Sequence, residues 1–568
     1  MNRDDNYWQR KLDSGRVTRR RFVGGAAVAG VGAAGLGIVG CGDDDSGGGG
    51  KVSADSTATP APSAVATLTP KKGGVWNNGA TGTIAGVHPF NSNFNGVYPI
   101  ALAYNYLFVS NLQNPEEGYH YDLATAHKAQ ADGVTWTFNL RSDAKIAPNK
   151  YGIAERPLDA DDVKASFDYI AEKKNGTNAF APFNDYFDKW DAPDKQTFRL
   201  VTKKPYAFTE NVIAHNLYCP IVPKEWIAKG ADQMKADIVG AGAFVLKEAT
   251  EGQVVRLEPN PNYWDKGKPY LSGIVSKQFA DLVTYRTAFQ AGQTDSYAPP
   301  NADEAKELVN AEKTLIRHSG PGLGYNSFWM NMKQKPWDDG RVRRAVNMAI
   351  NRQEFIDIIG RGIGEPIGPI TYAFKAEALP KEELAKLQPF DVAGAKALFQ
   401  QAGVTEFKFQ FPTSSNTPDY VTVFVRQMQA AGVTAKAEPL DAGTWYGQYL
   451  GSTLTASLSQ NQQYITPDLA MTWYRTNGIT GNNRFDTGFS DPEVDAALDK
   501  AASTLDAKAR ATAYQDLQRL VYKKDPAFVN FFGLRGEIVI RPHIMNYPAN
   551  RATNLLYNMT KNIWNNKA

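Results

Sequence analysis

Amides, hydroxyls and aromatic rings are concentrated in one stretch of this 568-residue chain, QNQQYITPDLAMTWY at 460–474. Its polar members are Gln460, Asn461, Gln462, Gln463, Tyr464 and Thr466. The flat apolar faces in or near the stretch are Trp445, Tyr446, Trp473 and Tyr474. Neutral groups that both donate and accept hydrogen bonds, beside aromatic planes, suit sugars or blocked, modified peptides. We predict non-covalent recognition of a polar solute, while packing in the core is the alternative role for part of this set.

Sequence patterns of enzyme active sites are absent. The chain has no GxSxG nucleophile motif, no HExxH metal motif and no GxxxxGK[ST] phosphate loop. His88, His215 and His318 stay open as nickel or haem ligands, although a lone histidine is usually structural. Adjacent carboxylates at Asp161 and Asp162 point apart on a helix, which favours a helical cap over paired acid–base catalysis. We therefore predict a binding protein that is not an enzyme and has no cofactor or metal.

The N-terminal segment TRRRFVGGAAVAGVGAAGLGIVGCG at 18–42 has the features of an export signal. A spanning helix needs about 20 strongly apolar residues, and glycine is a poor helix former, so an ordinary apolar helix is the weaker alternative. Arg19 and Arg20 stand in a pattern that resembles the twin-arginine signal. Residues 38–41 resemble a lipobox, in which Cys41 receives a diacylglycerol. We expect a signal peptide at 1–40 and a lipid anchor on Cys41.

Residues 41–72 are expected to form a flexible tether. The stretch is rich in glycine, serine, alanine and proline, and it contains no aromatic residue. It cannot offset its ordering entropy by burying apolar surface. Lipidation of Cys41 leaves Cys219 as the other cysteine, so no disulfide forms within the chain. The apolar neighbours of Cys219 predict a buried, inert thiol instead of a catalytic one.

The rest of the chain has the composition of a globular α/β protein. Net charge is only +3, 42% of residues are hydrophobic and 21% are charged, so nothing indicates nucleic-acid binding. Alternating apolar residues predict strands at 133–141, 196–202, 254–260 and 527–534. Helical spacing predicts helices at 157–173, 341–359 and 390–403, and two more within 491–526. At 341–359 the apolar residues share one side, and the arginines are expected on the other. Interleaved helices and strands favour layers on mixed sheets, in two or three domains.

Several stretches, taken in order, resemble a known family. They are GVTWTFNLRSDAKI (133–146), PLDADDVKASFDYI (157–170), GAGAFVLKEATEGQVVRLEPNPNYWDKGKPYLSGI (240–274), FWMNMKQKPWDDGRVRRAVNMAINR (328–352), FDVAGAKALFQQAG (390–403) and FSDPEVDAALDKA (489–501). The series is similar to the extracytoplasmic solute-binding proteins of the peptide/nickel (family 5) ABC importers. The resemblance covers nearly the whole mature chain.

The resemblance implies a two-lobed clamshell of the periplasmic-binding-protein type. Lobe one with an extra subdomain would span 73–298, lobe two 299–530, and 531–568 would return to lobe one. The crossing strands would be the hinge, and solute would shift the balance between open and closed lobes. A membrane permease would recognise the closed form, while a separate ATPase subunit hydrolyses ATP. The protein would act as a monomer, anchored in the periplasm or on the outer face of the plasma membrane.

The resemblance also points to a binding site. In peptide-binding members an aspartate in a segment resembling Asp-Tyr-Pro-Asp-Pro neutralises the ammonium of the ligand. Gln463 and Thr466 stand at the two aspartate positions here, and Asp468 is a substitute only if the loop shifts. A buried ammonium without a counter-charge is costly. The residues expected to bind ligand are Ser92, Asn93, Asn95, Tyr325, Asn326, Trp445, Tyr446, Gln460, Gln462, Gln463, Tyr464, Thr466 and Asp468.

Three classes of function follow from these observations. The favoured one is a substrate-binding lipoprotein of an ABC importer that captures a peptide or peptide-like solute; an oligosaccharide or other neutral polar solute is the alternative ligand. An extracellular hydrolase on a similar scaffold is the second class, and it would need a nucleophile or metal site. A chaperone or sensor receptor without a transport role is the third.

Overall fold

The computed structural model builds Pro70 to Ala568 around several β-sheets. Within the whole chain it describes residues 69–81, 86–91, 94–110, 119–177, 179–215, 218–413, 417–460, 466–476, 486–547 and 560–568. The expected signal peptide, Arg19, Arg20, Cys41 and nearly all of the expected tether lie outside these ranges. Among the described residues, no helix combines the length and the apolar character needed to cross a membrane.

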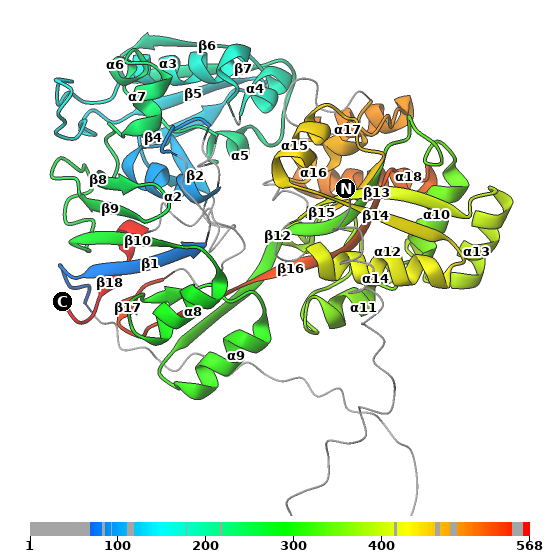
Figure 1. Cartoon of the computed structure of the whole chain (residues 1–568). Helices are drawn as coiled ribbons and strands as arrows, with labels where there is room; N and C mark the ends of the chain where they lie inside the picture. Colours follow the sequence, from blue (N-terminus) through cyan, green and yellow to red (C-terminus); the bar gives the residue numbers. More distant parts are fainter. Residues whose placement is uncertain are drawn as a thin grey trace, which may run out of the picture. The chain divides into compact units, whose positions relative to one another are not determined.

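The first lobe is built on a four-stranded mixed sheet (Figure 1). Its strand order is β1 (Val75–Thr81), β10 (Gly273–Phe279), β9 (Val254–Pro259) and β8 (Phe244–Thr250). β1 pairs in parallel with β10, and the other neighbours are antiparallel. Helix α2 (Phe94–Ala103) packs against β8. At the C-terminus β17 (Ile544–Met545) pairs with β18 (Trp564–Asn565), and the Asn565 amide donates to the Val75 carbonyl, 3.2 Å away.

A second, antiparallel sheet carries the extra part of this lobe. Its order is β4 (Ala124–Ala129), β5 (Thr135–Leu140), β7 (Thr197–Thr202) and β6 (Phe187–Asp194). The predicted alternation is confirmed, because Trp136, Phe138 and Leu140 are buried. Helix α3 (Ala160–Ala171), also predicted, packs on β6 and β7. The remaining short elements around this sheet are β2 (Phe108–Ser110), β3 (Tyr119–Tyr121), α4 (Phe180–Tyr186), α5 (Thr209–Ile213), α6 (Lys224–Ile227) and α7 (Ala231–Ala236).

A six-stranded sheet forms the centre of the second lobe. Its order is β11 (Ser296–Tyr297), β16 (Phe528–Ile540), β12 (Ile316–Met330), β15 (Ala456–Gln460), β13 (Glu406–Pro412) and β14 (Thr434–Leu440). Phe328, Phe409 and Phe424 lie at the centre of its core. The helices from α8 onward are α8 (Leu282–Gln290), α9 (Ala302–Ala311), α10 (Gly340–Ala349), α11 (Arg352–Ile358), α12 (Lys381–Leu387), α13 (Val392–Gln401), α14 (Thr417–Ala430), α15 (Ala442–Leu450), α16 (Pro467–Met471), α17 (Pro492–Ser503) and α18 (Ala507–Lys523). At its β11 end the sheet extends, with helices α8 and α9, to β1 of the first lobe.

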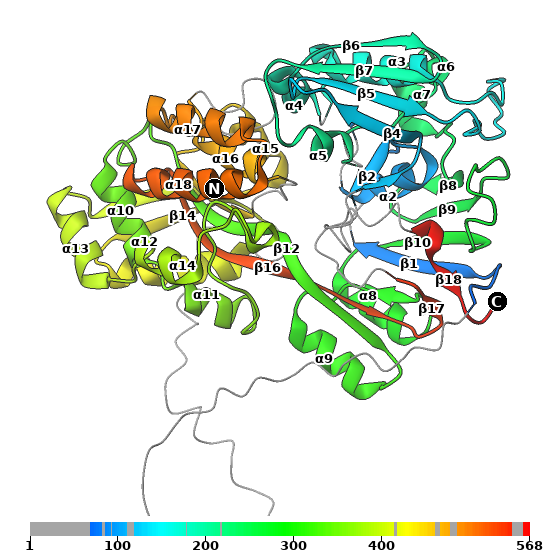
Figure 2. The same cartoon turned by 180° about the vertical axis from the view of Figure 1, so that it is seen from behind.

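Strands β12 and β16 run from one lobe into the other, as both views show (Figures 1 and 2). They pair antiparallel from Ile316 opposite Ile540 to Trp329 opposite Phe528. The register shifts between Pro321 and Tyr325 and again between Asn326 and Ser327. The two strands are therefore regularly paired within each lobe and irregular between them.

The arginines of the predicted amphipathic segment 341–359 do not all face solvent. The segment forms two helices, because the Asn351 side chain caps α11 by accepting from the Glu354 N–H. Arg343 and Arg352 are buried, so the prediction of an exposed arginine side was wrong for both. Arg343 donates to the Asp525 and Trp337 carbonyls, and Arg352 donates to the Asn530 carbonyl at 2.8 Å. Their long side chains hold helices α10 and α11 against β16 and the turn before it, and burial lowers the pKa of Arg352 to about 10.

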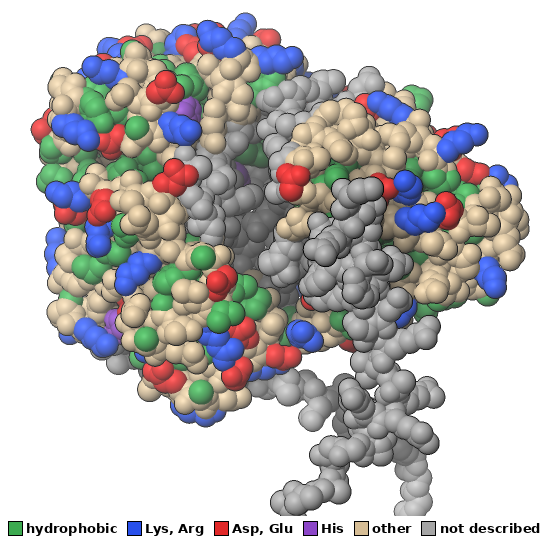
Figure 3. Space-filling model, in the orientation of Figure 1, with side chains coloured by type: hydrophobic (Ala, Val, Ile, Leu, Met, Phe, Trp, Pro, Cys, Tyr) green, Lys and Arg blue, Asp and Glu red, His purple; other side chains and the backbone are tan. Residues whose placement is uncertain are grey.

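Surface charge is evenly mixed on the face drawn in Figure 3. Basic and acidic side chains alternate over both lobes there, and neither kind gathers into an extended patch. This distribution agrees with a net charge of only +3 and gives no sign of a surface for nucleic acid.

A charged network fixes the start of α3. Asp159 is the N-cap and forms a capping box with Asp162. The helical-cap interpretation of Asp161 and Asp162 therefore holds for Asp162, while the Asp161 carboxylate pairs with Lys195 and Lys224. Arg156 holds both carboxylate oxygens of Asp162 at 2.7 Å and also pairs with Glu225 on α6, at 2.6 Å. Asp162 is fully buried. Because a buried carboxylate needs a partner, this arginine stabilises the α3–α6 contact, together with the Lys224 N–H, which also donates to Asp162.

We predict that Arg156→Met lowers the free energy of unfolding by about 3 kcal/mol, because it leaves the Asp162 charge buried without its cation. Urea denaturation followed by tryptophan fluorescence measures the change. The matched control is Arg199→Met, which breaks an equally close but exposed pair with Asp191 and should cost less than about 1 kcal/mol. Equal losses in the two variants would contradict the role given to Arg156.

Candidate functional site

Three of the residues expected to bind ligand lie on two neighbouring strands. In the register of β12 and β15, Asn326 stands directly opposite Gln460, and Tyr325 precedes Asn326. Tyr325 and Asn326 are both buried. The Asn326 amide donates to the Tyr420 hydroxyl of α14 at 2.5 Å. Tertiary structure thus brings together residues more than a hundred positions apart, at the point where β12 leaves the second lobe.

An aromatic cluster stands beside these strands. The Trp445 ring on α15 stacks on Tyr449, with centroids 5.1 Å apart, and its indole N–H donates to the Ser457 hydroxyl at 3.0 Å. Trp329 lies among them, with its ring 5.4 Å from Tyr449 and 5.4 Å from Trp473. Trp473 is nearly buried, so core packing accounts for it, whereas Trp445 is only half-buried. Trp445 therefore has a partly accessible ring that packs against the rings of Tyr449 and Trp329.

Thr466 and Asp468 are fully buried. Thr466 caps α16, since its hydroxyl accepts from the Leu469 N–H at 3.1 Å. The Asp468 carboxylate accepts hydrogen bonds from the hydroxyls of Tyr186, Tyr206 and Tyr514. Burial raises the pKa of Asp468, although those three hydroxyls and the charge of Arg475 act in the opposite direction. In this conformation the Asp468 carboxylate faces tyrosine hydroxyls and has no solvent-exposed surface.

The other residues expected to bind ligand are not placed by the structure. Ser92, Asn93, Gln462, Gln463 and Tyr464 lie outside the described residues. The backbones of Asn95, Tyr446 and Gln460 belong to α2, α15 and β15, but their side chains lie outside the description as well. Their contact with ligand stays a prediction.

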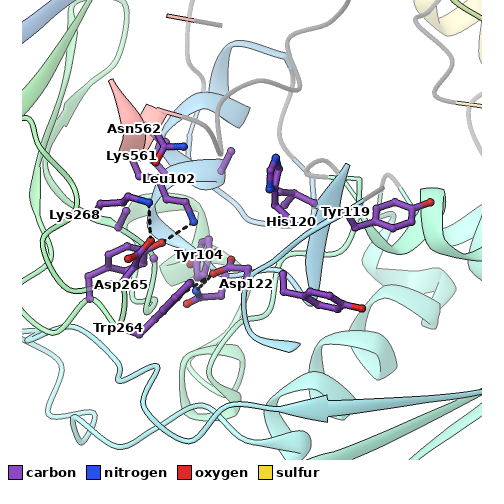
Figure 4. A pocket seen from close by; sticks show the side chains of 17 residues that line it. Leu102, Tyr104, Tyr119, His120, Asp122, Trp264, Asp265, Lys268, Lys561 and Asn562 are labelled. Atoms are coloured by element: carbon purple, nitrogen blue, oxygen red, sulfur yellow. Dashed lines mark hydrogen bonds and ion pairs between the residues drawn. The ribbon is translucent and has the colours of Figure 1, made fainter. Parts of the chain in front are cut away.

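A cavity of about 400 Å³ lies entirely within the first lobe (Figure 4). It is lined by the end of α2 and the two residues after it, by β2 and β3, by residues 263–268 and by residues 561–562. Asp122 on its wall accepts from the Asn105 amide at 2.8 Å and from the Trp264 indole at 3.1 Å. Sequence reasoning missed this cavity. The only signal was the stretch NPNYW (260–264), which attracted notice as a family landmark and supplies Tyr263 and Trp264.

The polar groups of this cavity are organised around those two rings. The Lys561 ammonium donates to the Tyr263 hydroxyl at 3.1 Å and lies 5.3 Å from the centre of the Trp264 ring. Burial lowers the pKa of Lys561. Lys268 pairs with Asp265 at 3.1 Å. Aromatic faces with a few convergent polar groups, in a volume of this size, are typical of small-molecule sites, so the cavity suits a small polar solute.

His88, His215 and Cys219 are buried, which favours a role in packing. His88 accepts from the Phe90 N–H at 3.3 Å. Burial lowers the pKa of His88 to about 4 and that of His215 to about 3, so both are neutral at pH 7. Cys219 is a buried free thiol whose pKa burial raises, as its apolar neighbours predicted. Within the described ranges no group of three or more His, Cys, Asp or Glu side chains could hold a metal ion.

Comparison with known proteins identifies the family. Residues 118–483 match the model of the bacterial extracellular solute-binding proteins, family 5 Middle. The chain belongs to this family. It is also 26% identical over 425 residues to the glutathione-binding protein GsiB of Salmonella paratyphi A, covering 71% of this chain and 78% of that protein.

Solved structures confirm the two-lobed periplasmic-binding-protein fold. The periplasmic binding protein DppA from Helicobacter pylori, in complex with the peptide STSA, has a TM-score of 0.76 and 19% identity, over 87% of this chain and 99% of that one. The protein AgaA of A. tumefaciens R10, in complex with agropinic acid, has a TM-score of 0.74 and 20% identity, over 87% of this chain and 99% of that one. The family 5 chain is thus an extracytoplasmic solute-binding protein with mixed sheets flanked by helices, as the sequence predicted.

The buried histidines generate a pH prediction for this family 5 protein. Their pKa values lie below the ordinary value of 6.5, so the unfolded chain binds more protons, and stability falls as pH drops from about 6.5 toward 4. We expect His215→Gln to reduce the slope of unfolding free energy against pH by about 1 kcal/mol per pH unit near pH 5. Urea denaturation at a series of pH values measures the slope. The same slope in parent and variant would contradict a neutral, buried His215.

Proposed function

We propose that this protein is the substrate-binding lipoprotein of an ABC importer, and that it captures a peptide or peptide-like solute between two closing lobes. Membership of the family over residues 118–483 is the observation that carries the proposal. The joining of the lobes through β12 and β16, with register shifts between them, supports a hinge at this crossing. Solute that contacts both lobes would favour the closed form, which the permease would then recognise.

The solute class is proposed from the relatives and from the residues of the 460–474 segment. GsiB is named for glutathione and DppA was solved with a peptide. Gln463 and Thr466 replace the two aspartates of the peptide-binding pattern, and Asp468 is enclosed by tyrosine hydroxyls. We therefore favour a peptide-like solute whose amino group this segment does not neutralise. The same two replacements favour the alternative ligand, an oligosaccharide or other neutral polar solute.

Export and anchoring complete the proposal. Arg19 and Arg20 would direct export through the twin-arginine route, and Cys41 would carry the lipid that holds the protein at the membrane. The tether at 41–72 would keep the lobes close to the permease and its ATPase subunits. The protein would work as a monomer, in the periplasm or on the outer face of the plasma membrane.

Isothermal titration tests the solute class. The ligands are free and N-acetylated peptides of two to five residues, glutathione, and short glucans. Saturable heat with peptides or glutathione supports the proposal, and equal heat from free and acetylated peptides supports recognition without an ammonium partner. Saturable heat only with glucans would reject the peptide version in favour of the alternative. Hydrolysis of any bound ligand would instead support the second class of function.

Gln463 is expected to contact the solute. We predict that Gln463→Ala weakens binding about tenfold, because one or two hydrogen bonds are lost, while the melting temperature of the empty protein stays nearly unchanged. Titration and differential scanning calorimetry provide the two measurements. Gln233→Ala, on the exposed face of α7, is the control and should bind like the parent. Unchanged affinity in Gln463→Ala would remove this residue from the site.

The export route yields a separate prediction. Arg19→Lys combined with Arg20→Lys should block export, so that unprocessed precursor accumulates in the cytosol. Cell fractionation and mass spectrometry of the N-terminus report processing and lipidation of Cys41. Normal lipidation in the double variant would indicate the general secretory route, and Arg3→Lys with Arg10→Lys provides the matched control outside the motif.

A further inference from the structure

The Asp468 carboxylate is contacted from both lobes at once. Tyr186 ends α4 and Tyr206 lies in the loop after β7, so both belong to the extra part of the first lobe. Asp468 on α16 and Tyr514 on α18 belong to the second lobe. The Tyr206 hydroxyl lies 3.2 Å from one carboxylate oxygen, and the Tyr514 hydroxyl lies 3.3 Å from the other. Tyr186 donates to the same oxygen as Tyr206.

This polar cluster is buried and closely packed. Asp468 and Tyr514 are fully buried, Tyr206 is 1% exposed and Tyr186 is 7% exposed. The rings of Tyr186 and Tyr206 lie parallel, with centroids 3.8 Å apart. A buried carboxylate that receives three hydroxyl donors is well satisfied, whereas the same carboxylate without them would be costly. The cluster therefore holds together only while both lobes contribute to it.

Neighbouring contacts show that the first lobe docks here along a continuous edge. The Lys204 ammonium pairs with Asp499 of α17 at 2.8 Å. The Ala207 N–H donates to the Ala502 carbonyl at 2.9 Å. The Arg510 guanidinium lies 5.4 Å from the centre of the Phe208 ring. In Figures 1 and 2 this edge lies at the opposite end of the lobes from the crossing of β12 and β16, so any hinge motion at that crossing separates these groups most.

We propose that Asp468, Tyr186, Tyr206 and Tyr514 form an interlobe latch that assembles on closure and couples closure to the uptake of a proton by Asp468. This proposal rests on the lobe closure of the proposed function. It adds pH, acting through protonation of Asp468, as a factor that regulates closure. The residues from the first lobe would leave the carboxylate when the lobes open, while Tyr514 would stay beside it.

The direction of the coupling follows from burial. Closure removes Asp468 from water, and this desolvation raises its pKa; the three tyrosine hydroxyls and the charge of Arg475 lower it by less. Arg475 is itself paired with Asp499 at 2.9 Å. The other charged groups around the cluster are Asp185, which acts on Tyr186, and Arg510, which acts on Tyr514. The closed form thus binds a proton more tightly than the open form, and falling pH favours closure.

Single-molecule energy transfer in the empty protein tests the latch. Dyes are attached at Lys189→Cys on β6 and Lys508→Cys on α18, two exposed positions, in the full chain carrying Cys41→Ser; Cys219 is buried. The expected result is a closed fraction that rises as pH falls from 7.5 to 5. Asp468→Asn should remove this dependence and stay mainly closed at both pH values. A closed fraction independent of pH in the parent would overturn the coupling.

Tyrosine variants separate a latch from ordinary packing. Tyr186→Phe or Tyr206→Phe should lower the closed-to-open ratio about tenfold, because each removes a donor that only the closed form provides. Tyr514→Phe is the matched control, since its hydroxyl can reach Asp468 in both forms, and it should change the ratio less than threefold. Equal effects of all three would overturn the latch. Circular dichroism melting confirms that each variant is folded.

An infrared difference spectrum gives a second readout, independent of the dyes. A carboxylic-acid band should appear in the closed protein at pH 5 and be absent in Asp468→Asn; its absence in the parent would overturn protonation of Asp468. Because these measurements use the empty protein, they can succeed even if no peptide, glutathione or glucan binds. A failure of the proposed function can therefore be distinguished from a failure of the latch proposal.

Discussion

The antiparallel pairing of β12 with β16 is the constraint on which the rest of this protein depends. At one end Leu315 and Val539 belong to a small core with α8 and α9. At the other end Phe328 and Phe531 belong to the core of the second lobe. Each core is closely packed and resists deformation, whereas the paired strands change register between them. We therefore expect any motion of one lobe against the other to be concentrated at the crossing.

The chemistry of the 460–474 segment depends on where its one charged residue lies. The segment at 460–474 carries Gln463 and Thr466 at the positions where the resemblance implies aspartates, and its one aspartate, Asp468, contacts tyrosine hydroxyls of both lobes. A carboxylate exposed to the solute would favour ligands with an ammonium group. A buried carboxylate instead changes the relative stability of the open and closed conformations. The same residue type thus serves ligand recognition in one setting and control of closure in another, and burial decides which.

Much of the fold could be predicted from local sequence patterns. The alternation of apolar residues at 133–141 predicted β5. The acidic residues followed by apolar residues at helical spacing in 157–173 predicted α3. Both predictions succeed because each pattern lies within one element. The prediction that the arginines of 341–359 face solvent was wrong for Arg343 and Arg352. Their burial depends on hydrogen bonds to backbone carbonyls in or near β16, which lie far along the chain. The candidate site was predicted less completely: Asn326 and Gln460 do meet across β12 and β15, while the cavity lined by Tyr263 and Trp264 had only the stretch NPNYW (260–264) as a signal.

The amino-acid sequence by itself determined the family, the two-lobed α/β fold, the absence of enzyme motifs and the neutral character of the 460–474 segment. These properties are carried by residue types and by spacings within single elements. Only the tertiary structure decided that Asp468 meets Tyr186 and Tyr206, and that Lys561 reaches Tyr263. Those pairs lie 282, 262 and 298 positions apart, and the contacts arise from the packing of whole elements. Periodic patterns along the chain cannot predict these contacts, because the contacts depend on how strands and helices pack in space.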